Sequence, residues 1–394
     1  MLRHSVSAAF MSRAAVLVSS GRLWGLSPRA GVLAAAAVWW TAPGALAAEL
    51  AVPQQYETIQ AAINAASDGD RVLVSAGIYH EQVNLSGKGI QLIAIAGSEF
   101  TAIDGDDVRT VIVGSNEPAT CVVRGFTIQH GRDYGYNNGG GVKIRGSSAT
   151  FSECRFVANR AVEPAWWGGG AWLSEYGNPR IDHCTFVGNY GGGNVAGVYH
   201  YLGGGITVSD CVFQDNTSAS GQCIHIQTEG GTIAASIQRC TFRRFESNYQ
   251  GGGCYPVGFW NPYGGMINCS ISDCIAEEPR PFPGAQSGMV GFMAIGSYPD
   301  ASYGVTLTNI QCCGVQNLVQ SDGHSAWVDG GGNVLGANCC PADANRDGIV
   351  DGRDLGVLLV GWGTCIGCKS DTSGDGQIDG VDLGVLISAW GPCP

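Results

Sequence analysis

The sequence predicts an all-β solenoid of stacked coils, followed by a small helical module. Two observations predict this fold. A motif centred on a cysteine recurs at a nearly constant interval in the middle of the chain, and an acidic motif occurs twice near its end. Repeats of 20–50 residues are typical of solenoids, because each repeat buries its apolar face against the next one.

The first 47 residues have the pattern of a secretory signal. They contain four arginines and no acidic residue, then an apolar run at residues 30–40, then Ala45-Leu46-Ala47. We expect cleavage after Ala47 and a secreted protein, extracellular or in the cell envelope. A membrane anchor is the alternative, but the run is short for a bilayer and no other stretch approaches the required length. We therefore expect no transmembrane helix in the mature chain.

The charge of the mature chain restricts its partners. Removing the signal leaves 17 basic and 33 acidic residues, a formal net charge of −16. This charge argues against nucleic acid and anionic lipid as partners. An anionic polysaccharide would need calcium or a local arginine cluster to bridge the repulsion. The 16 cysteines of an exported chain also predict disulfides, although not for every cysteine.

The central repeat has the pattern of short β-strands. An apolar residue, two polar ones, a cysteine and, two residues later, a phenylalanine recur with the cysteines at Cys154, Cys184, Cys211 and Cys240. Alternating inward and outward residues indicate strands rather than helices. Three residues after the phenylalanine stand Asn159, Asn189 and Asn216, which would stack into a ladder at one turn. Triple glycines mark other corners.

The cysteine column has two interpretations. Stacked inward cysteines are small apolar side chains whose parallel Cβ vectors suit disulfides poorly, so we favour reduced thiols in the core. The pairs Cys312-Cys313 and Cys339-Cys340, near the end of the solenoid, are better placed for a disulfide staple.

With these repeats the chain resembles the right-handed parallel β-helix (pectin-lyase-like) family, which includes pectate lyases, pectin methylesterases and polygalacturonases. Residues 56–66, with Ile59 and Ile63 facing inward, would form an N-terminal helix that caps the first coil. We assign residues 1–47 to the signal peptide, 48–338 to the β-helix and 339–394 to the C-terminal module. Roughly nine coils would fit.

The acidic motif near the end has the spacing of a calcium loop. Acids, amides or hydroxyls stand at loop positions 1, 3, 5, 9 and 12, glycine permits the turn at position 6, and position 7 supplies a backbone carbonyl. Two calcium ions are expected. The ligands would be Asp343, Asn345, Asp347, Ile349, Asp351 and Asp354 in the first loop, and Asp371, Ser373, Asp375, Gln377, Asp379 and Asp382 in the second.

Each loop is followed by apolar residues at helical spacing, and no helical segment precedes it. We expect Leu355, Leu358, Leu359 and Trp362 to pack against Leu383, Leu386, Ile387 and Trp390. A loop with only an exiting helix resembles the type I dockerin module, which implies a cohesin-like or envelope partner. Loop positions 10 and 11 help select the partner in dockerins, and the two copies, Gly352-Arg353 and Gly380-Val381, differ at position 11. A fixed structural or anchoring role is therefore equally open. Symmetry favours the disulfides Cys340–Cys365 and Cys368–Cys393 among three possible pairings.

Catalytic groups of β-helix enzymes stand on outward positions of adjacent coils, as the resemblance implies. The residues before the column cysteines are the candidates: Glu153, His183, Asp210, Arg239 and Asp273. A carboxylate, a histidine and an arginine in one stack could abstract a proton and stabilise the charge that develops. The alternative is a solvated face of mixed charge, and no complete catalytic signature of the family is present.

Aromatic residues gather in the glycine-rich segments between coils. Exposed rings on a rigid frame can stack on sugars, and the candidates for this role are Trp166, Trp167, Trp172, Tyr176 and Trp260. Packing as lids over the solenoid is the alternative.

Together these features predict an exported protein that binds or processes extracellular polysaccharide and is anchored by a calcium-dependent module. If it is an enzyme, the class is a polysaccharide lyase or a glycoside hydrolase. The alternative is a non-catalytic surface, adhesion or structural envelope protein.

Overall fold

The computed structural model describes most of the chain after the predicted signal. The described residues are 47–108, 110–134, 138–161, 168–193, 195–248, 253–262, 264–277, 279–281, 291–297, 301–313, 317–321, 327–336, 342–345, 349–364, 370–373 and 377–392. No helix among them is long and apolar enough to cross a membrane.

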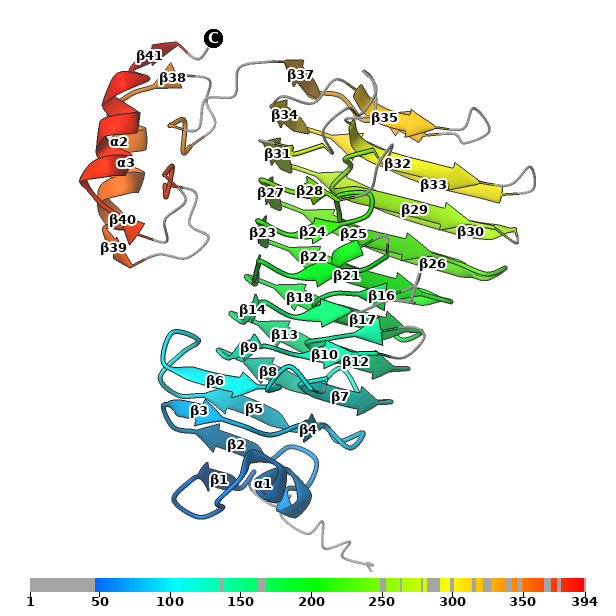
Figure 1. Ribbon diagram of the computed structural model, residues 1–394, viewed down its shortest axis with the longest axis vertical. Helices are drawn as coiled ribbons and strands as arrows, with labels where there is room; N and C mark the ends of the chain where they lie inside the picture. The colour runs from blue at the N-terminus through cyan, green and yellow to red at the C-terminus, as the bar shows by residue number, and fades with distance from the viewer. Residues whose placement is uncertain are drawn as a thin grey trace, which may run out of the picture. The chain divides into compact units, whose positions relative to one another are not determined.

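Residues 49–336 form a parallel β-helix (Figure 1), in which every strand pairs in parallel with the equivalent strand of the next coil. Sheet A has eleven strands. They are β1 (Glu49–Val52), β2 (Arg71–Val74), β5 (Gln91–Ala94), β8 (Val122–Arg124), β13 (Thr150–Ser152), β18 (Arg180–Asp182), β22 (Gly204–Ser209), β26 (Thr232–Gln238), β30 (Gly265–Ser272), β33 (Ala301–Thr308) and β36 (Trp327–Asp329).

Sheet B follows sheet A in each coil and has ten strands. They are β3 (Gly77–Tyr79), β6 (Thr101–Asp104), β9 (Thr127–Gln129), β14 (Arg155–Val157), β19 (Thr185–Val187), β23 (Val212–Gln214), β27 (Thr241–Arg243), β31 (Ile275–Glu277), β34 (Gln311–Cys313) and β37 (Val334–Gly336). The expected nine coils were thus slightly too few. The first coils are shorter than the central ones, since Arg71 on β2 already pairs with Gln91 on β5.

Two further sheets complete the coils. Sheet D is short and spans five coils: β10 (Arg132–Asp133), β15 (Arg160–Ala161), β20 (Tyr190–Gly191), β24 (Thr217–Ser218) and β28 (Glu246–Ser247). Sheet C comprises β4 (Val83–Asn84), β7 (Ile112–Ser115), β11 (Asn138–Gly139), β12 (Val142–Arg145), β16 (Gly168–Gly169), β17 (Trp172–Glu175), β21 (Val195–Tyr201), β25 (Gln222–Gln227), β29 (Val257–Asn261), β32 (Gly291–Ser297) and β35 (Asn317–Ser321).

The predicted capping helix is confirmed as α1 (Ile59–Ala65), which packs against β1, β2 and β4. Ile59 and Ile63 are fully buried. The helix begins at Thr58, whose hydroxyl accepts a hydrogen bond from the Ala61 amide at 3.1 Å. The Glu81 carboxylate accepts the amides of Ile59 and Gln60 at 2.9 Å each, which satisfies donors that a helix start leaves free.

The interior consists of columns of like residues, as in-register stacking requires. The rings of Phe156, Phe186 and Phe213 stack with centroids 4.5 Å apart. The predicted cysteine column is confirmed as a row of buried free thiols: Cys154, Cys184, Cys211, Cys240 and Cys274. Cys312, a candidate for a disulfide staple, is also free and buried.

The predicted asparagine ladder is confirmed at the corner between sheets B and D. The side-chain amide of Asn159 donates to Asn189 at 3.1 Å, and that of Asn189 donates to Asn216 at 3.0 Å. Each amide also donates to a backbone carbonyl of the preceding coil. Glycine is required nearby, because a Cβ on Gly170 would lie 2.5 Å from the carbonyl oxygens of Ala196 and Tyr190.

The C-terminal module consists of two equivalent halves. The first has β38 (Ile349–Val350), α2 (Gly352–Val360) and β39 (Gly363–Thr364), and the second has β40 (Gln377–Ile378), α3 (Gly380–Ser388) and β41 (Gly391–Pro392). Strand β38 pairs antiparallel with β41, and β39 with β40, so each half pairs with the other. A separate small core holds Ala342, Val350, Leu358, Ile378 and Leu386.

Candidate functional site

The five catalytic candidates lie at one corner of the β-helix, between sheets A and B. All have positive φ, from 50° for His183 to 55° for Asp273, so they are turn residues whose side chains point outward. Three of them, Glu153, Asp210 and Arg239, form ion pairs. Glu153 binds Arg124 through two bonds of 2.8 and 3.0 Å, and Arg239 binds Asp210 through bonds of 2.6 and 2.8 Å.

His183 and Asp273 are also engaged at this corner. The His183 ring bonds Asp182 at 2.9 Å, and Asn309 donates to Asp273 at 3.0 Å. The hydrogen bond that His183 donates to the Asp182 carboxylate raises the pKa of His183, and this effect exceeds the lowering of that pKa by burial. The column is therefore a stack of mutually neutralising charges, which is the arrangement expected of a solvated face.

The aromatic candidates do not form one exposed platform. Trp172 was expected at the surface, but this is wrong: it is fully buried, and its ring packs edge-on against Phe151 at 4.7 Å. It pairs in register with Val142 and Val198, so its strand directs it into the core. Tyr176 is 41% exposed beneath the Arg145 guanidinium, Trp260 is partly buried, and Trp166 and Trp167 lie outside the described residues.

A cavity of about 370 Å³ lies at the other corner, between sheets B and D. It is lined by Asp107, His130, Ala158, Arg160, Gly188, Asn189, Tyr190 and Thr217. These residues come from consecutive coils, so the cavity extends along the stack. Its volume falls in the range of small-molecule sites in proteins.

Two arginines lie at this corner, where Asp107 is also part of the cavity lining. Arg132 and Arg160 are paired in register on β10 and β15. Each guanidinium lies over a tyrosine ring, Arg132 over Tyr134 at 4.9 Å and Arg160 over Tyr190 at 5.1 Å. Within the described part of the chain neither forms an ion pair with a carboxylate, and Arg132 Nε is buried without a hydrogen-bond partner. Of the two, Arg160 lines the cavity.

A histidine–aspartate pair opens onto the same cavity. His130 Nδ1 lies 2.9 Å from an oxygen of Asp104, whose side chain also accepts from Gln129 at 2.7 Å. Burial raises the pKa of Asp104, but hydrogen bonds from Gln129, the Asp106 amide and His130 lower it further, so the net shift is downward. An ionised Asp104 orients the imidazole and leaves its Nε2 for a ligand.

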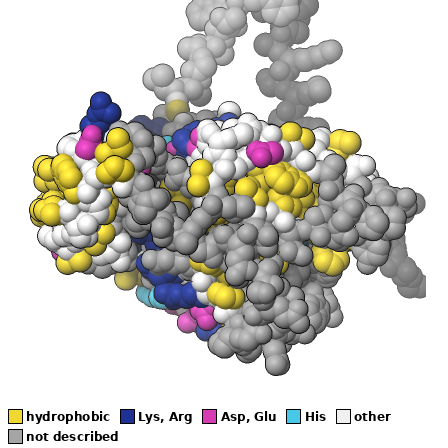
Figure 2. All heavy atoms as spheres, turned by 90° about the horizontal axis from the view of Figure 1, so that it is seen from above, with side chains coloured by type: hydrophobic (Ala, Val, Ile, Leu, Met, Phe, Trp, Pro, Cys, Tyr) yellow, Lys and Arg dark blue, Asp and Glu magenta, His cyan; other side chains and the backbone are white. Residues whose placement is uncertain are grey.

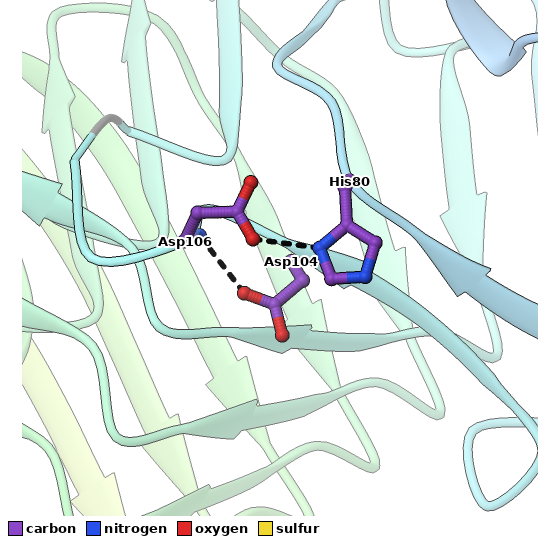
Figure 3. A group of neighbouring side chains, drawn as sticks. All are labelled: His80, Asp104 and Asp106. Carbon is purple, nitrogen blue, oxygen red and sulfur yellow. Dashed lines mark hydrogen bonds and ion pairs between the residues drawn. The ribbon is translucent and has the colours of Figure 1, made fainter.

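His80 continues this group on the preceding coil (Figure 3). Its Nδ1 lies 2.6 Å from Asp106 Oδ1, and the Asp106 amide donates to Asp104 at 2.9 Å. The sequence analysis did not identify these residues. They occupy the irregular first coils, where no repeat aligns them, and only the strand register brings positions 80, 104 and 130 together.

The two acidic loops of the C-terminal module hold equivalent buried carboxylates. Asp354 accepts the amides of Asn345 and Asp351 at 3.0 and 2.8 Å. Asp382, its equivalent in the second loop, accepts those of Ser373 and Asp379 at 2.8 and 2.9 Å. Both aspartates are fully buried. Each therefore joins the start of its loop to the start of the following helix.

The described donors of these loops are oxygen atoms, the type of ligand that calcium binds. Burial raises the pKa of Asp382, but hydrogen bonds from Asp379, Ser373 and Thr372 lower it further, so the carboxyl favours its charged form. In the described part of the module no lysine or arginine pairs with Asp354 or Asp382. A buried charge without a counter-ion is costly, and an all-oxygen set is what calcium binds. The predicted ligands Asp347 and Asp375 lie outside the described residues, as do the tail cysteines.

The helices bury a narrower stripe than expected. Leu358 and Leu386 are buried and Leu355 and Leu383 pack beside them, as predicted. The prediction that the last two apolar positions of each half also lie in the core is wrong. The inward face of each helix is centred instead on its buried aspartate and its buried leucine. Leu359, Trp362, Ile387 and Trp390 are about half exposed, at 53%, 49%, 59% and 53%. Figure 2 shows hydrophobic side chains gathered on this module, at the left of the view.

The comparisons with known proteins agree with this fold. Residues 83–261 match a family model described as "Right handed beta helix region", which supports a right-handed parallel β-helix. No curated protein sequence matches the chain. Among solved structures, pectate lyase Pel9A aligns with TM-score 0.43 and 11% identity, over 76% of this chain and 83% of that one.

Two pectin methylesterases align similarly. The carrot enzyme has TM-score 0.37 and 12% identity, over 72% of this chain and 88% of its own. The Aspergillus niger enzyme has TM-score 0.40 and 12% identity, over 75% and 93%. Similarity this distant says nothing of substrate or catalytic residues, so function rests on the side chains described above.

Proposed function

We propose that this protein binds or processes extracellular polysaccharide through its β-helix and is anchored by a calcium-dependent C-terminal module. The observation that carries the first half is the cavity at the corner of sheets B and D, with Arg160, Tyr190 and His130 in its lining. Guanidinium, phenol and imidazole groups all hydrogen-bond the hydroxyl and carboxylate groups of sugars.

The corner between sheets B and D suits a linear sugar chain. Arg132, Arg160, Tyr190 and Thr217 occupy the same register position on successive coils. Adjacent strands lie about 4.8 Å apart, so a sugar chain running along the stack meets one such side chain per coil. The net negative charge of the mature protein would repel an acidic polysaccharide unless calcium or arginines offset the repulsion. Arg132 and Arg160 would offset it at this corner.

The same corner contains the groups that lyase chemistry needs. In such a reaction, His130 Nε2 would accept the proton from the carbon next to a sugar carboxylate, and Asp104 would stabilise the imidazolium that forms. Arg160 would stabilise the charge developing on the carboxylate. The glycosidic C–O bond then breaks as the carbon–carbon double bond forms, the leaving sugar oxygen takes up a proton from water, and the His130 imidazolium returns its proton to the solvent.

The C-terminal module supports the anchoring half of the proposal. Among the described residues no basic side chain pairs with the buried Asp354 and Asp382, and Leu359, Trp362, Ile387 and Trp390, on or just after the two helices, are exposed. An exposed apolar surface repeated on both halves suits a partner protein, of the cohesin or cell-envelope type. Calcium would couple the two features, because Asp354 and Asp382, the last predicted ligand of each loop, lie on the helices that carry Leu359 and Ile387. The predicted secretory signal places both partners outside the cell.

A polysaccharide screen tests the proposal. The purified mature chain, saturated with calcium, is incubated with neutral and acidic plant and algal polysaccharides, and binding is measured along with new unsaturated or reducing ends. We expect at least one polysaccharide to bind, and His130→Ala to abolish any product while leaving binding within a few fold. Binding without product would assign a non-catalytic role. A screen in which no glycan binds would refute the polysaccharide assignment and leave a structural envelope protein.

A further inference from the structure

Three side chains at the N-terminal end of the β-helix form a group with metal-ligand chemistry. His80 directly follows β3, Asp104 ends β6, and Asp106 lies in the turn after it. One ligand atom from each lies within 4.8 Å of the others. Figure 3 shows the His80 ring and the two carboxylates converging. Asp104 is buried, whereas His80 and Asp106 are exposed.

We propose that His80, Asp104 and Asp106 bind a divalent transition-metal ion of the zinc type. This site is separate from the two calcium loops and goes beyond the proposed function. One imidazole and two carboxylates are a donor set that zinc accepts, with a fourth position left for water or a ligand. A hard ion such as calcium would gain little from the imidazole nitrogen.

The observed spacing requires only small movements. Zinc holds nitrogen and oxygen ligands at about 2.0–2.1 Å in a tetrahedron, so neighbouring ligand atoms lie about 3.3 Å apart. His80 Nδ1 and Asp106 Oδ1 are 2.6 Å apart and would separate slightly as the ion replaces their hydrogen bond. The remaining gaps, up to 4.8 Å, would close by rotation of the exposed His80 and Asp106 side chains.

Asp104 is held in place by a shell of hydrogen bonds. Its oxygens accept the Gln129 side chain at 2.7 Å, His130 Nδ1 at 2.9 Å and the Asp106 amide at 2.9 Å. A carboxylate has about four acceptor positions, so one remains for a metal. Such outer contacts orient metal ligands and typically change affinity about 10- to 100-fold when removed.

A second group of the same composition serves as an internal contrast. Asp182, His183 and Asp210 also place ligand atoms within 4.8 Å. In this second group Asp210 is bound by the Arg239 guanidinium at 2.6 and 2.8 Å, and Asp182 accepts the Ser209 hydroxyl at 2.6 Å. A metal ion would have to displace a cation from this group, so we assign no metal to it.

The test titrates the calcium-saturated full chain with Zn²⁺ by calorimetry and with Co²⁺ by absorption spectroscopy. We expect one tightly bound ion per chain, with Co²⁺ bands of nitrogen and oxygen ligands. His80→Ala and the isosteric Asp106→Asn should each weaken binding at least tenfold, and Gln129→Ala about tenfold. The matched control His183→Ala should bind like the parent.

Three results would overturn the assignment. They are no Zn²⁺ binding by the parent below millimolar concentration, equal binding by parent and His80→Ala, and a Co²⁺ spectrum dominated by thiolate charge transfer. Hydrogen exchange across residues 77–106 verifies that each variant is folded. Because the readout is metal binding, the outcome does not depend on whether any polysaccharide binds.

Discussion

Replacing Asn189 with alanine should weaken the β-helix at one defined place. The Asn189 side chain donates to the Phe156 carbonyl at 2.9 Å and to Asn216 at 3.0 Å, and it accepts the backbone and side-chain amides of Asn159 at 3.0 and 3.1 Å. All three asparagines are buried, so water does not replace the lost partners.

The expected cost follows from these four bonds. A buried hydrogen bond contributes about 1 kcal/mol, and each buried group left without a partner costs about 1–3 kcal/mol. Asn189→Ala should therefore destabilise its coil by about 4 kcal/mol. In a solenoid each repeat interacts mainly with its neighbours, so the loss should be confined to the coils containing Asn159, Asn189 and Asn216.

Native-state hydrogen exchange measures this local loss. A change of about 4 kcal/mol corresponds to roughly a thousandfold faster exchange, which we expect at residues 155–161 and 185–191, with residues 71–94 unchanged. The matched control is Asn248→Ala, which removes one exposed bond to the Tyr190 hydroxyl and should change exchange less than threefold. Acceleration below tenfold in Asn189→Ala would refute the additive, buried-ladder reasoning.

Two further predictions concern the tail and the corner of mixed charge. Calcium chelation should accelerate exchange across residues 343–354 while the β-helix keeps its protection, since the carboxylates there would repel one another; unchanged exchange would count against the calcium loops. The raised pKa of His183 means that its pair with Asp182 stabilises the fold below the unfolded pKa of about 6.5 and loses this contribution as pH rises through the folded value. NMR should therefore find the His183 midpoint raised in the parent and lowered by Asp182→Asn; identical midpoints would exclude the pairing.

The solenoid could be predicted from sequence because stacking in register makes like residues recur. A cysteine, a phenylalanine and an asparagine at fixed spacing indicated three columns, and each column is present. Burial of Trp172 was also encoded, because it stands 12 residues before Cys184, as the buried Val142 stands 12 residues before Cys154. Gly139 pairs with Gly169, and Val142 pairs with Trp172. The high glycine content of this segment suggested a loop with an exposed Trp172, and this inference was wrong.

The groups at the cavity could not be predicted in this way. His80, Asp104 and His130 belong to coils of unequal length, so no constant interval connects them, and their proximity depends on strand register. Arg132 and Arg160 do lie one coil apart, but the sequence does not reveal that, among the described residues, no carboxylate pairs with either of them. Arg239 shows the opposite error. Its place in the repeat made it a catalytic candidate, but Asp210 neutralises its charge.

The most direct test of the account is calorimetric binding of an oligosaccharide series, cut from whichever polysaccharide binds, to the calcium-saturated chain. We predict that affinity rises with chain length, because successive coils present successive side chains. Arg160→Ala and Tyr190→Ala should each weaken binding about tenfold, the loss of one charge-assisted contact. Arg145→Ala, which removes a guanidinium from the Tyr176 ring at another corner, should bind like the parent. Equal affinity in the parent, Arg160→Ala and Tyr190→Ala would contradict the assignment of this cavity to sugar binding.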